Sequence, residues 1–268
     1  MATNTQRAAE ARAKAQQQAK AKERRTTLVI IASAVLVIAA FAGIVAFIVN
    51  SSKVPELPEA HAPAPADASG GIPVGTGGVV GVDVPTDAVR VDLYLDLMCP
   101  VCKRLEQVNS ADIDAMREAG TIAVYYHPVA ILNRFSQGTK YPSRASNAVA
   151  VVADRDPAHF LDFMAALYAN QPEEKTPGLD DATIAQIAEG VGVPSDVAVS
   201  FKNGEFSAWV SAATDQASID GMTVTPTVMV NVQILDPKLV PFFQEGVLKT
   251  YLESLPKPDG TPPGPGGK

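Results

Sequence analysis

Cysteine is scarce in this chain of 268 residues, which has two, at positions 99 and 102. A pair three positions apart excludes a scaffold stapled by several disulfides, and it excludes a zinc site of four cysteines. Basic residues are too few for a nucleic-acid-binding face, because 22 Lys and Arg stand against 29 Asp and Glu and the net charge is -7. Apolar residues, in contrast, make up 47% of the chain, which is enough for a folded core.

The longest apolar run covers residues 28–49, which are 22 residues without a charge. As a helix this run would be about 33 Å long, and a bilayer core is about 30 Å thick. Residues 1–27 carry seven basic and two acidic residues, whereas the chain after residue 49 has a net charge of -12. Because basic flanks stay in the cytoplasm, this pattern predicts a basic cytoplasmic segment, a transmembrane signal-anchor helix at 28–49, and an extracytoplasmic remainder.

Two alternatives exist for the apolar run. A cleaved signal peptide has a shorter apolar region of about 7–15 residues, and no clean small-x-small cleavage motif follows Val49. A buried helix of a soluble domain does not fit the basic flank on one side and the proline-rich stretch on the other. An uncleaved anchor in the lipid bilayer therefore explains the run best.

Proline and glycine mark the borders of the folded part. Residues 50–71 are rich in Pro and Ala, which predicts an extended extracytoplasmic linker. Residues 256–268 contain five prolines and four glycines, which predicts a disordered tail. The folded domain is therefore expected at residues 72–255, a size that one hydrophobic core can support.

Hydrophobic periodicity within this domain predicts an α/β fold. Segments rich in β-forming residues predict strands at 78–84, 89–97, 121–128, 227–230 and 232–235. Helical spacing predicts helices at 103–119, 143–154, 158–170, 181–190, 195–201, 205–220 and 240–254. The first strong strand–helix–strand unit implies a parallel pair with a crossover helix, and a helical insertion at about 130–220 separates it from the later strands.

The two cysteines lie in the segment Cys99-Pro100-Val101-Cys102, where a predicted strand passes into a helix. Backbone N–H groups at a helix N-terminus lack intrahelical partners and, with the helix dipole, stabilise a negative charge. Cys99 is therefore expected to have a depressed pKa and to act as a nucleophile. The i, i+3 spacing places Cys102 on the same turn, where it would resolve a mixed disulfide formed by Cys99.

Three alternatives for this pair involve no redox activity. A structural disulfide here would close a minimal loop and stabilise the fold little. A zinc site needs more ligands, and His61 lies in the predicted linker while His127 lies at a strand end. Two inert thiols are unexpected outside the cell membrane, where thiols are oxidised. The pattern favours a redox pair that uses no metal or other cofactor.

Three stretches of the chain carry a resemblance to a known family. They are LDLMCPVCKRLE at 95–106, YANQPEE at 168–174 and GMTVTPTVMVN at 221–231. In this order they resemble the membrane-anchored DsbA-like proteins of actinobacteria, a branch of the thioredoxin superfamily. The resemblance covers about residues 77–255, and it implies an α/β thioredoxin fold with an inserted helical subdomain and thiol–disulfide oxidoreductase activity.

The resemblance also implies roles for individual residues. Cys99 corresponds to the nucleophilic cysteine and Cys102 to the resolving one. Pro226 corresponds to a cis-proline that lies against the redox pair, and Thr225 corresponds to the residue whose backbone pairs with the substrate peptide.

One position departs from the family pattern. Many thioredoxin-like proteins have a buried carboxylate six residues before the first cysteine, where it accepts a proton from the resolving thiol, but position 93 is leucine here. Asp96, and less favourably Asp92, are candidate replacements. The alternative is that both are solvated acids near the end of a strand.

Other conspicuous residues have ordinary explanations. His127 is expected to pack at a strand end rather than to act as a base. Trp209, in the middle of a predicted helix, is expected to fill the core. The pair Glu173 and Glu174 lies between two prolines and is expected in an exposed loop.

These patterns predict an extracytoplasmic oxidoreductase held in the cell membrane by a single pass. An oxidising compartment favours the donation of disulfides to exported proteins that contain cysteine. The resemblance implies a quinone-linked membrane reoxidase of the vitamin K epoxide reductase or DsbB type. The alternatives are an extracytoplasmic disulfide reductase and a non-catalytic, membrane-tethered binding module with a thioredoxin fold.

Overall fold

The computed structural model of the protein describes residues 56–57 and 60–256. The predicted cytoplasmic segment, the predicted transmembrane helix, the start of the linker and residues 257–268 of the tail lie outside this range. None of the helices within it is long and apolar enough to cross a membrane.

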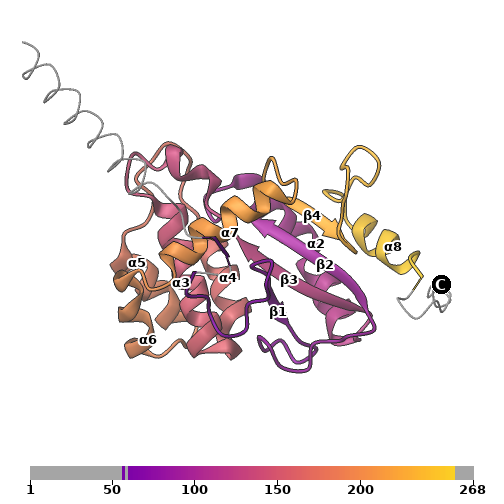
Figure 1. Ribbon diagram of the computed structural model, residues 1–268, viewed down its shortest axis with the longest axis horizontal. Coiled ribbons are helices and arrows are strands. Elements are labelled where there is room, and N and C mark those ends of the chain that lie inside the picture. The colour runs from indigo at the N-terminus through magenta and orange to yellow at the C-terminus, as the bar shows by residue number, and fades with distance from the viewer. Residues whose placement is uncertain (1–55, 58–59, 257–268) are drawn as a thin grey trace, which may run out of the picture. The chain divides into compact units, whose positions relative to one another are not determined.

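A five-stranded mixed sheet forms the centre of the domain (Figure 1). Its strands are β1 (Ile72–Val74), β2 (Val89–Leu95), β3 (Ile122–Pro128), β4 (Thr227–Val230) and β5 (Gln233–Ile234). The order across the sheet is β1-β3-β2-β4-β5, and β2 and β3 run parallel while the other neighbours are antiparallel. The predicted parallel pair is therefore confirmed, and the nearly continuous burial of β2 and β3 shows that both faces of the sheet are covered.

The crossover between β2 and β3 is helix α2 (Pro100–Glu118). It begins three residues earlier than predicted, because Pro100 occupies the first turn, where a missing backbone N–H costs nothing. Leu105 and Ile113 lie on its buried side. Gly120, with φ of 68°, ends the helical path and returns the chain to the sheet.

The region between β3 and β4 is helical, as predicted. Its elements are η2 (Ile131–Phe135), α3 (Tyr141–Arg155), η3 (Pro157–His159), α4 (Phe160–Ala169), α5 (Asp181–Gly190), α6 (Ser195–Val199), η4 (Ser200–Asn203) and α7 (Ser207–Ile219). Figure 1 shows α3 to α6 gathered beside the sheet, and α3 is its central helix because every residue from 145 to 153 is buried.

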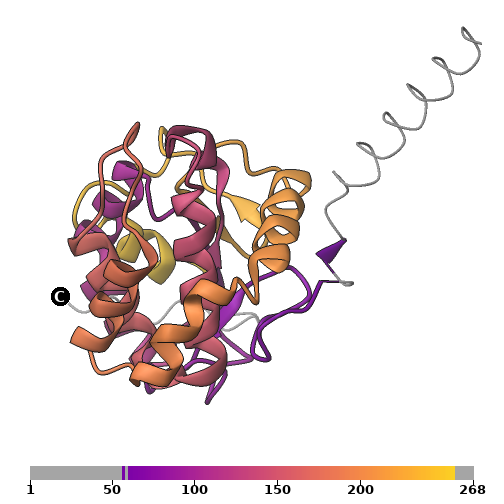
Figure 2. The same ribbon diagram turned by 90° about the vertical axis from the view of Figure 1, so that its left-hand side faces the viewer.

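Helices cover both faces of the sheet. In Figure 2, α7 lies on one side, and α2 lies on the other together with the C-terminal helix α8 (Val247–Glu253). Trp209 on α7 is fully buried, which confirms its predicted place in the core.

Two predicted elements were wrong in position or extent. The segment 78–84 is a set of turns, because Gly78 and Gly81 have φ of 78° and 71°, and the actual edge strand is β1. The last helix starts seven residues later than predicted, since Gly246 has φ of 74° and precedes its first turn.

The described part of the predicted linker is not a free spacer. The backbone N–H of Ala64 donates to the Asp154 carboxylate at 2.8 Å, and Arg90 pairs with Asp67 at 2.7 Å. Leu57 is buried in the main core. The folded unit therefore begins closer to the N-terminus than residue 72.

Candidate active site

The end of β2 and the start of α2 place both cysteines at one edge of the sheet. Cys99 is the N-cap residue of α2, with φ of -79° and ψ of 115°, and Cys102 lies in the first turn. Both are free thiols and both are buried, with 4% and 0% of the residue exposed. The backbone N–H of Cys102 donates to the carbonyl of Cys99 at 3.1 Å, which closes the first turn around the pair.

The surroundings of the two thiols drive their pKa values apart. A hydrogen bond from Cys102 is the largest influence on Cys99 and, against the opposing effect of burial, lowers its pKa to about 6. The Thr225 side chain and the backbone N–H groups of Cys102 and Val101 add to this effect. Burial raises the pKa of Cys102 well above its ordinary value. Cys99 is thus the thiolate near neutral pH and Cys102 the neutral thiol.

The loop before β4 forms the opposite wall of this site. The Thr225–Pro226 peptide bond is cis, as the resemblance implied, and Pro226 is buried. The Sγ atom of Cys99 lies 3.3 Å from the carbonyl oxygen of Thr225. The structure therefore brings together Cys99, Cys102, Thr225 and Pro226, the four residues that the family pattern selected.

Asp96 lies directly behind the redox pair. It has no exposed surface, and its two oxygens accept hydrogen bonds from the backbone N–H groups of Met98 and Leu132, each at 2.9 Å. Burial outweighs these two bonds and raises its pKa to about 7. The alternative of a solvated strand-end acid is therefore wrong. Asp96 joins the cysteine loop to the helical insertion, and it can exchange a proton near neutral pH.

Asp92 belongs to a different cluster. Its carboxylate contacts Arg90 and lies 2.9 Å from Nε2 of His127, and these contacts hold its pKa below the usual value despite burial. His127 is more than a packing residue, since it bonds to Asp92 and stacks on Tyr94 with ring centroids 4.1 Å apart. A carboxylate so engaged is a structural ion-pair partner rather than a proton acceptor for Cys102.

Sequence reasoning missed Glu106 and Tyr168. Glu106 follows Cys102 by four residues and therefore lies on the same side of α2. Burial, followed by the charge of Asp114, raises its pKa to about 7. The hydroxyl of Tyr168 is buried and has no hydrogen-bond partner among the described residues. The i+4 spacing was a signal for the glutamate, and Tyr168 is the first residue of the stretch 168–174 that carries the family resemblance, but its position depends on the packing of α4.

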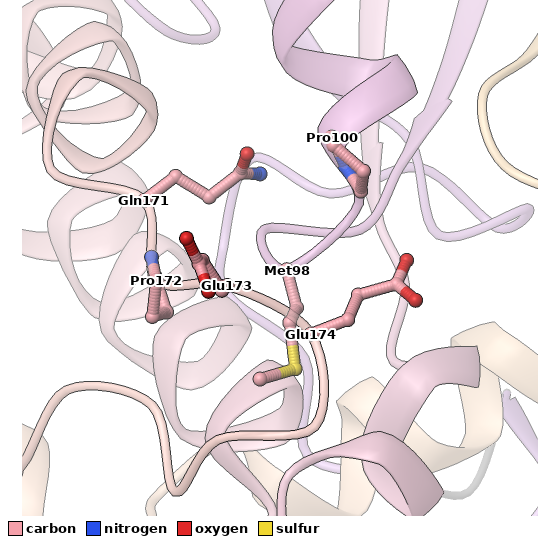
Figure 3. A pocket seen from close by; sticks show the side chains of 6 residues that line it. All are labelled: Met98, Pro100, Gln171, Pro172, Glu173 and Glu174. Carbon is pink, nitrogen blue, oxygen red and sulfur yellow. The ribbon is translucent and has the colours of Figure 1, made fainter.

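Gln171, after the end of α4, holds the cysteine loop from the side of the helical insertion. Its side-chain amide donates to the carbonyl oxygens of Leu97 at 3.1 Å and Cys99 at 3.0 Å. Next to these bonds is a cavity of about 330 Å³. It is lined by Met98, Pro100, Gln171, Pro172, Glu173 and Glu174, as Figure 3 shows. In the described part of the chain, no group of three or more His, Cys, Asp or Glu could hold a metal ion.

A sheet with an inserted helical region, a Cys-x-x-Cys pair at a helix start and a cis-proline against it together define a thiol–disulfide oxidoreductase with a thioredoxin fold. The family model described as thioredoxin matches residues 85–244, which is more than half of the chain, and the chain therefore belongs to the thioredoxin family. The inserted helices make it a DsbA-like member.

Solved structures agree with this assignment. MdbA, a thiol-disulfide oxidoreductase from Actinomyces oris, superposes with a TM-score of 0.58 at 22% identity, over 75% of this chain and 96% of that one, which shows the shared fold. Reduced DsbA from Mycobacterium tuberculosis superposes with a TM-score of 0.53 at 26% identity, over 65% of this chain and 90% of that one.

A curated relative matches this chain over only part of its length. The serine/threonine-protein kinase PknE of Mycobacterium tuberculosis is 30% identical over 118 residues, which are 42% of this chain and 21% of the kinase. The chain thus spans about a fifth of the length of this curated relative.

Proposed function

We propose that this oxidoreductase is an extracytoplasmic oxidase that transfers its Cys99–Cys102 disulfide to exported proteins. The observation that carries the proposal is the lowered pKa of Cys99, about 6, beside a Cys102 whose pKa is raised. A stabilised thiolate favours the reduced form of the pair, and a pair whose reduced form is favoured is a strong oxidant. The Mycobacterium tuberculosis relative named DsbA supports the same assignment.

The proposed reaction has two exchange steps. A substrate thiolate attacks the Sγ of Cys99, the protein disulfide breaks, and Cys102 leaves and takes up a proton. A second substrate thiolate attacks the substrate sulfur of the mixed disulfide, and Cys99 leaves as a thiolate. Two electrons pass from the substrate dithiol to the pair, one proton ends on Cys102, and the other enters solvent because Cys99 stays ionised above about pH 6.

Asp96 is the proposed proton donor to Cys102 in this direction and the acceptor in the reverse one. Its pKa of about 7 lets both protonation states exist near neutral pH. Burial is the main cause of the raised pKa of Cys102, and the charge of Asp96 makes a smaller contribution in the same direction. Thr225, whose carbonyl faces Cys99, is the proposed backbone partner of the substrate peptide.

The reduction potential of the Cys99–Cys102 pair in the full chain tests the direction of transfer. Equilibration with glutathione buffers should give a value near about -120 mV, as for a strong disulfide donor. A value near about -270 mV, as for thioredoxin, would contradict the oxidase proposal. The protein would then be a disulfide reductase, which is the second candidate function because both directions of transfer use the same cysteine pair.

The proposal also includes a membrane anchor and a redox partner. Residues 28–49 would anchor it in the cell membrane with the N-terminus in the cytoplasm, on the strength of the uncharged run and its basic flank. An oxidase must itself be reoxidised, and the proposed partner is a quinone-linked membrane protein of the vitamin K epoxide reductase or DsbB type. Protease digestion of intact spheroplasts, which removes an extracytoplasmic domain and spares a cytoplasmic one, tests the orientation.

A further inference from the structure

We infer that the cavity beside Cys99 is a subsite for a lysine or arginine side chain of the substrate, close in sequence to the cysteine that reacts. This inference rests on the proposed function and specifies which substrates the site prefers.

The position of the cavity links it to the chemistry. Met98 and Pro100, which flank Cys99 in the chain, form one part of its lining, and residues 171–174 form the rest (Figure 3). A peptide whose cysteine sulfur reaches Cys99 would lie next to this opening, because both chain neighbours of Cys99 line it. Residues near that cysteine are therefore the ones whose side chains can enter a space of about 330 Å³.

The cavity combines apolar surface with two carboxylates. Pro100 and Pro172 supply apolar surface, and Met98, which also lines the cavity, is itself buried, whereas Glu173 and Glu174 supply negative charge. Lysine and arginine side chains have the matching shape, since an aliphatic stem can lie on the apolar surface while the charged end meets a carboxylate. An acidic side chain would meet repulsion, and a purely apolar one would leave the carboxylates without a counter-charge.

These two carboxylates are free to take a counter-charge from the substrate. Neither is a member of an ion pair among the described residues. Lys103, on the first turns of α2, points its ammonium group to the carbonyl of Ala169 at 3.5 Å and does not line the cavity. The charge of Glu174 reaches the active site, since it contributes to the raised pKa of Asp96.

The segment 171–174, which carries the two carboxylates, is held in place at both ends. Gln171 binds the carbonyl oxygens of Leu97 and Cys99, and the backbone N–H of Lys175 donates to the carbonyl of Phe135 at 2.8 Å. The Thr176 hydroxyl donates to the carbonyl of Glu173 at 2.7 Å. A backbone fixed before the substrate arrives loses little conformational entropy on binding, so the charges that it carries can contribute to selectivity.

The test uses the full chain with Cys102→Ser, so that the reaction stops at the mixed disulfide. Three peptides are compared that carry one cysteine as a thionitrobenzoate disulfide and differ in one neighbouring residue, which is Lys, Gln or Glu. Attack by the Cys99 thiolate on the peptide sulfur forms the protein–peptide disulfide and releases coloured thionitrobenzoate. The rate constant reports recognition in a reaction that does not depend on the physiological direction of transfer.

We expect the Lys peptide to react about three- to tenfold faster than the Glu peptide at low ionic strength, and salt to reduce the difference. The double variant Glu173→Gln, Glu174→Gln should bring this ratio close to one. The control Glu189→Gln, Glu253→Gln removes the same charge from exposed helix positions and should keep the preference.

Equal rates for the three peptides, or a preference that survives in the double variant, would overturn the subsite while leaving the oxidoreductase intact. Failure of all three peptides to release thionitrobenzoate would instead contradict the proposed function, and the subsite with it.

Discussion

The Sγ atom of Cys99 lies 3.3 Å from the carbonyl oxygen of Thr225, a residue 126 positions later in the chain. The sheet makes this contact possible, because β2 and β4 are antiparallel neighbours and Tyr94 pairs with Thr227. The end of β2 that leads into the cysteines therefore lies beside the start of β4. The helical insertion lies between these two strands in the chain, and the pairing of β2 with β4 brings the two parts of the redox site together.

Substitutions of Cys99 and of Cys102 are expected to have different effects on the reaction. Cys99→Ala should lower the rate of disulfide transfer by about 10³-fold or more with the fold intact, because it removes the sulfur that substrate attacks. Cys102→Ser should instead accumulate mixed disulfides between Cys99 and substrate proteins, visible as reduction-sensitive adducts on gels. A Cys99→Ala protein that keeps its full effect on envelope proteins would identify a binding module instead.

The reactivity of Cys99 should follow its own ionisation. Alkylation of the reduced protein by iodoacetamide is expected to rise with pH around a midpoint near 6, while Cys102 stays unreactive in that range because its pKa is raised. Thr225→Val removes a hydroxyl that stabilises the thiolate and should move the midpoint up by about half a pH unit. Thr223→Val, at an exposed position two residues earlier, is the matched control and should leave the midpoint in place.

Local patterns predicted the redox pair, the parallel strands and most helices because each depends on residues that are close in sequence. The cysteine motif, the alternation in β2 and the spacing in α5 are signals of this kind. The edge strand β1 was missed because three residues around a proline carry too short a pattern. The cavity beside Cys99 and the buried pairing of Asp92 with His127 depend on tertiary packing, which no local pattern encodes.

Asp92 is expected to matter for stability and not for redox chemistry. Its pKa is lowered in the fold, so its ionised form stabilises the native state above about pH 4, and that stability is lost as the pH falls through the lowered value. Asp92→Asn leaves the buried His127 without its carboxylate, while the partly exposed Arg90 keeps only Asp67, and it should cost about 3 kcal/mol of unfolding free energy at pH 7, as measured by urea denaturation. The reduction potential should stay unchanged, and a shifted potential would place Asp92 back among the redox residues.

Asp96 should show the opposite dependence of stability on pH. Its pKa is raised, so the fold favours the neutral acid, and stability falls as the pH rises from about 4 through 7. Asp96→Asn cannot ionise, and it also loses one of two accepted hydrogen bonds, which costs about 1 kcal/mol at every pH. In the disulfide form, where neither cysteine titrates, the variant should therefore gain about 2–4 kcal/mol relative to the wild type between pH 4 and pH 8. A stability difference that does not change with pH would show that Asp96 ionises normally.

A kinetic measurement can distinguish Asp96 from Glu106 as the group that exchanges a proton with Cys102. Both carboxyl groups have a pKa of about 7, but Asp96 also bonds to the N–H of Met98 in the cysteine loop. Asp96→Asn should slow the attack of Cys102 on the mixed disulfide, which is the reverse of the proposed transfer, by about tenfold or more at pH 7, because the acceptor of the Cys102 proton is removed. Glu106→Gln is the matched variant on α2, and it should leave that rate within about twofold while stabilising the fold at pH 8 by removing a partly buried charge. Stopped-flow measurement of mixed-disulfide decay checks both, and if Glu106→Gln is the slower protein, the proton moves through the helix and not through the loop.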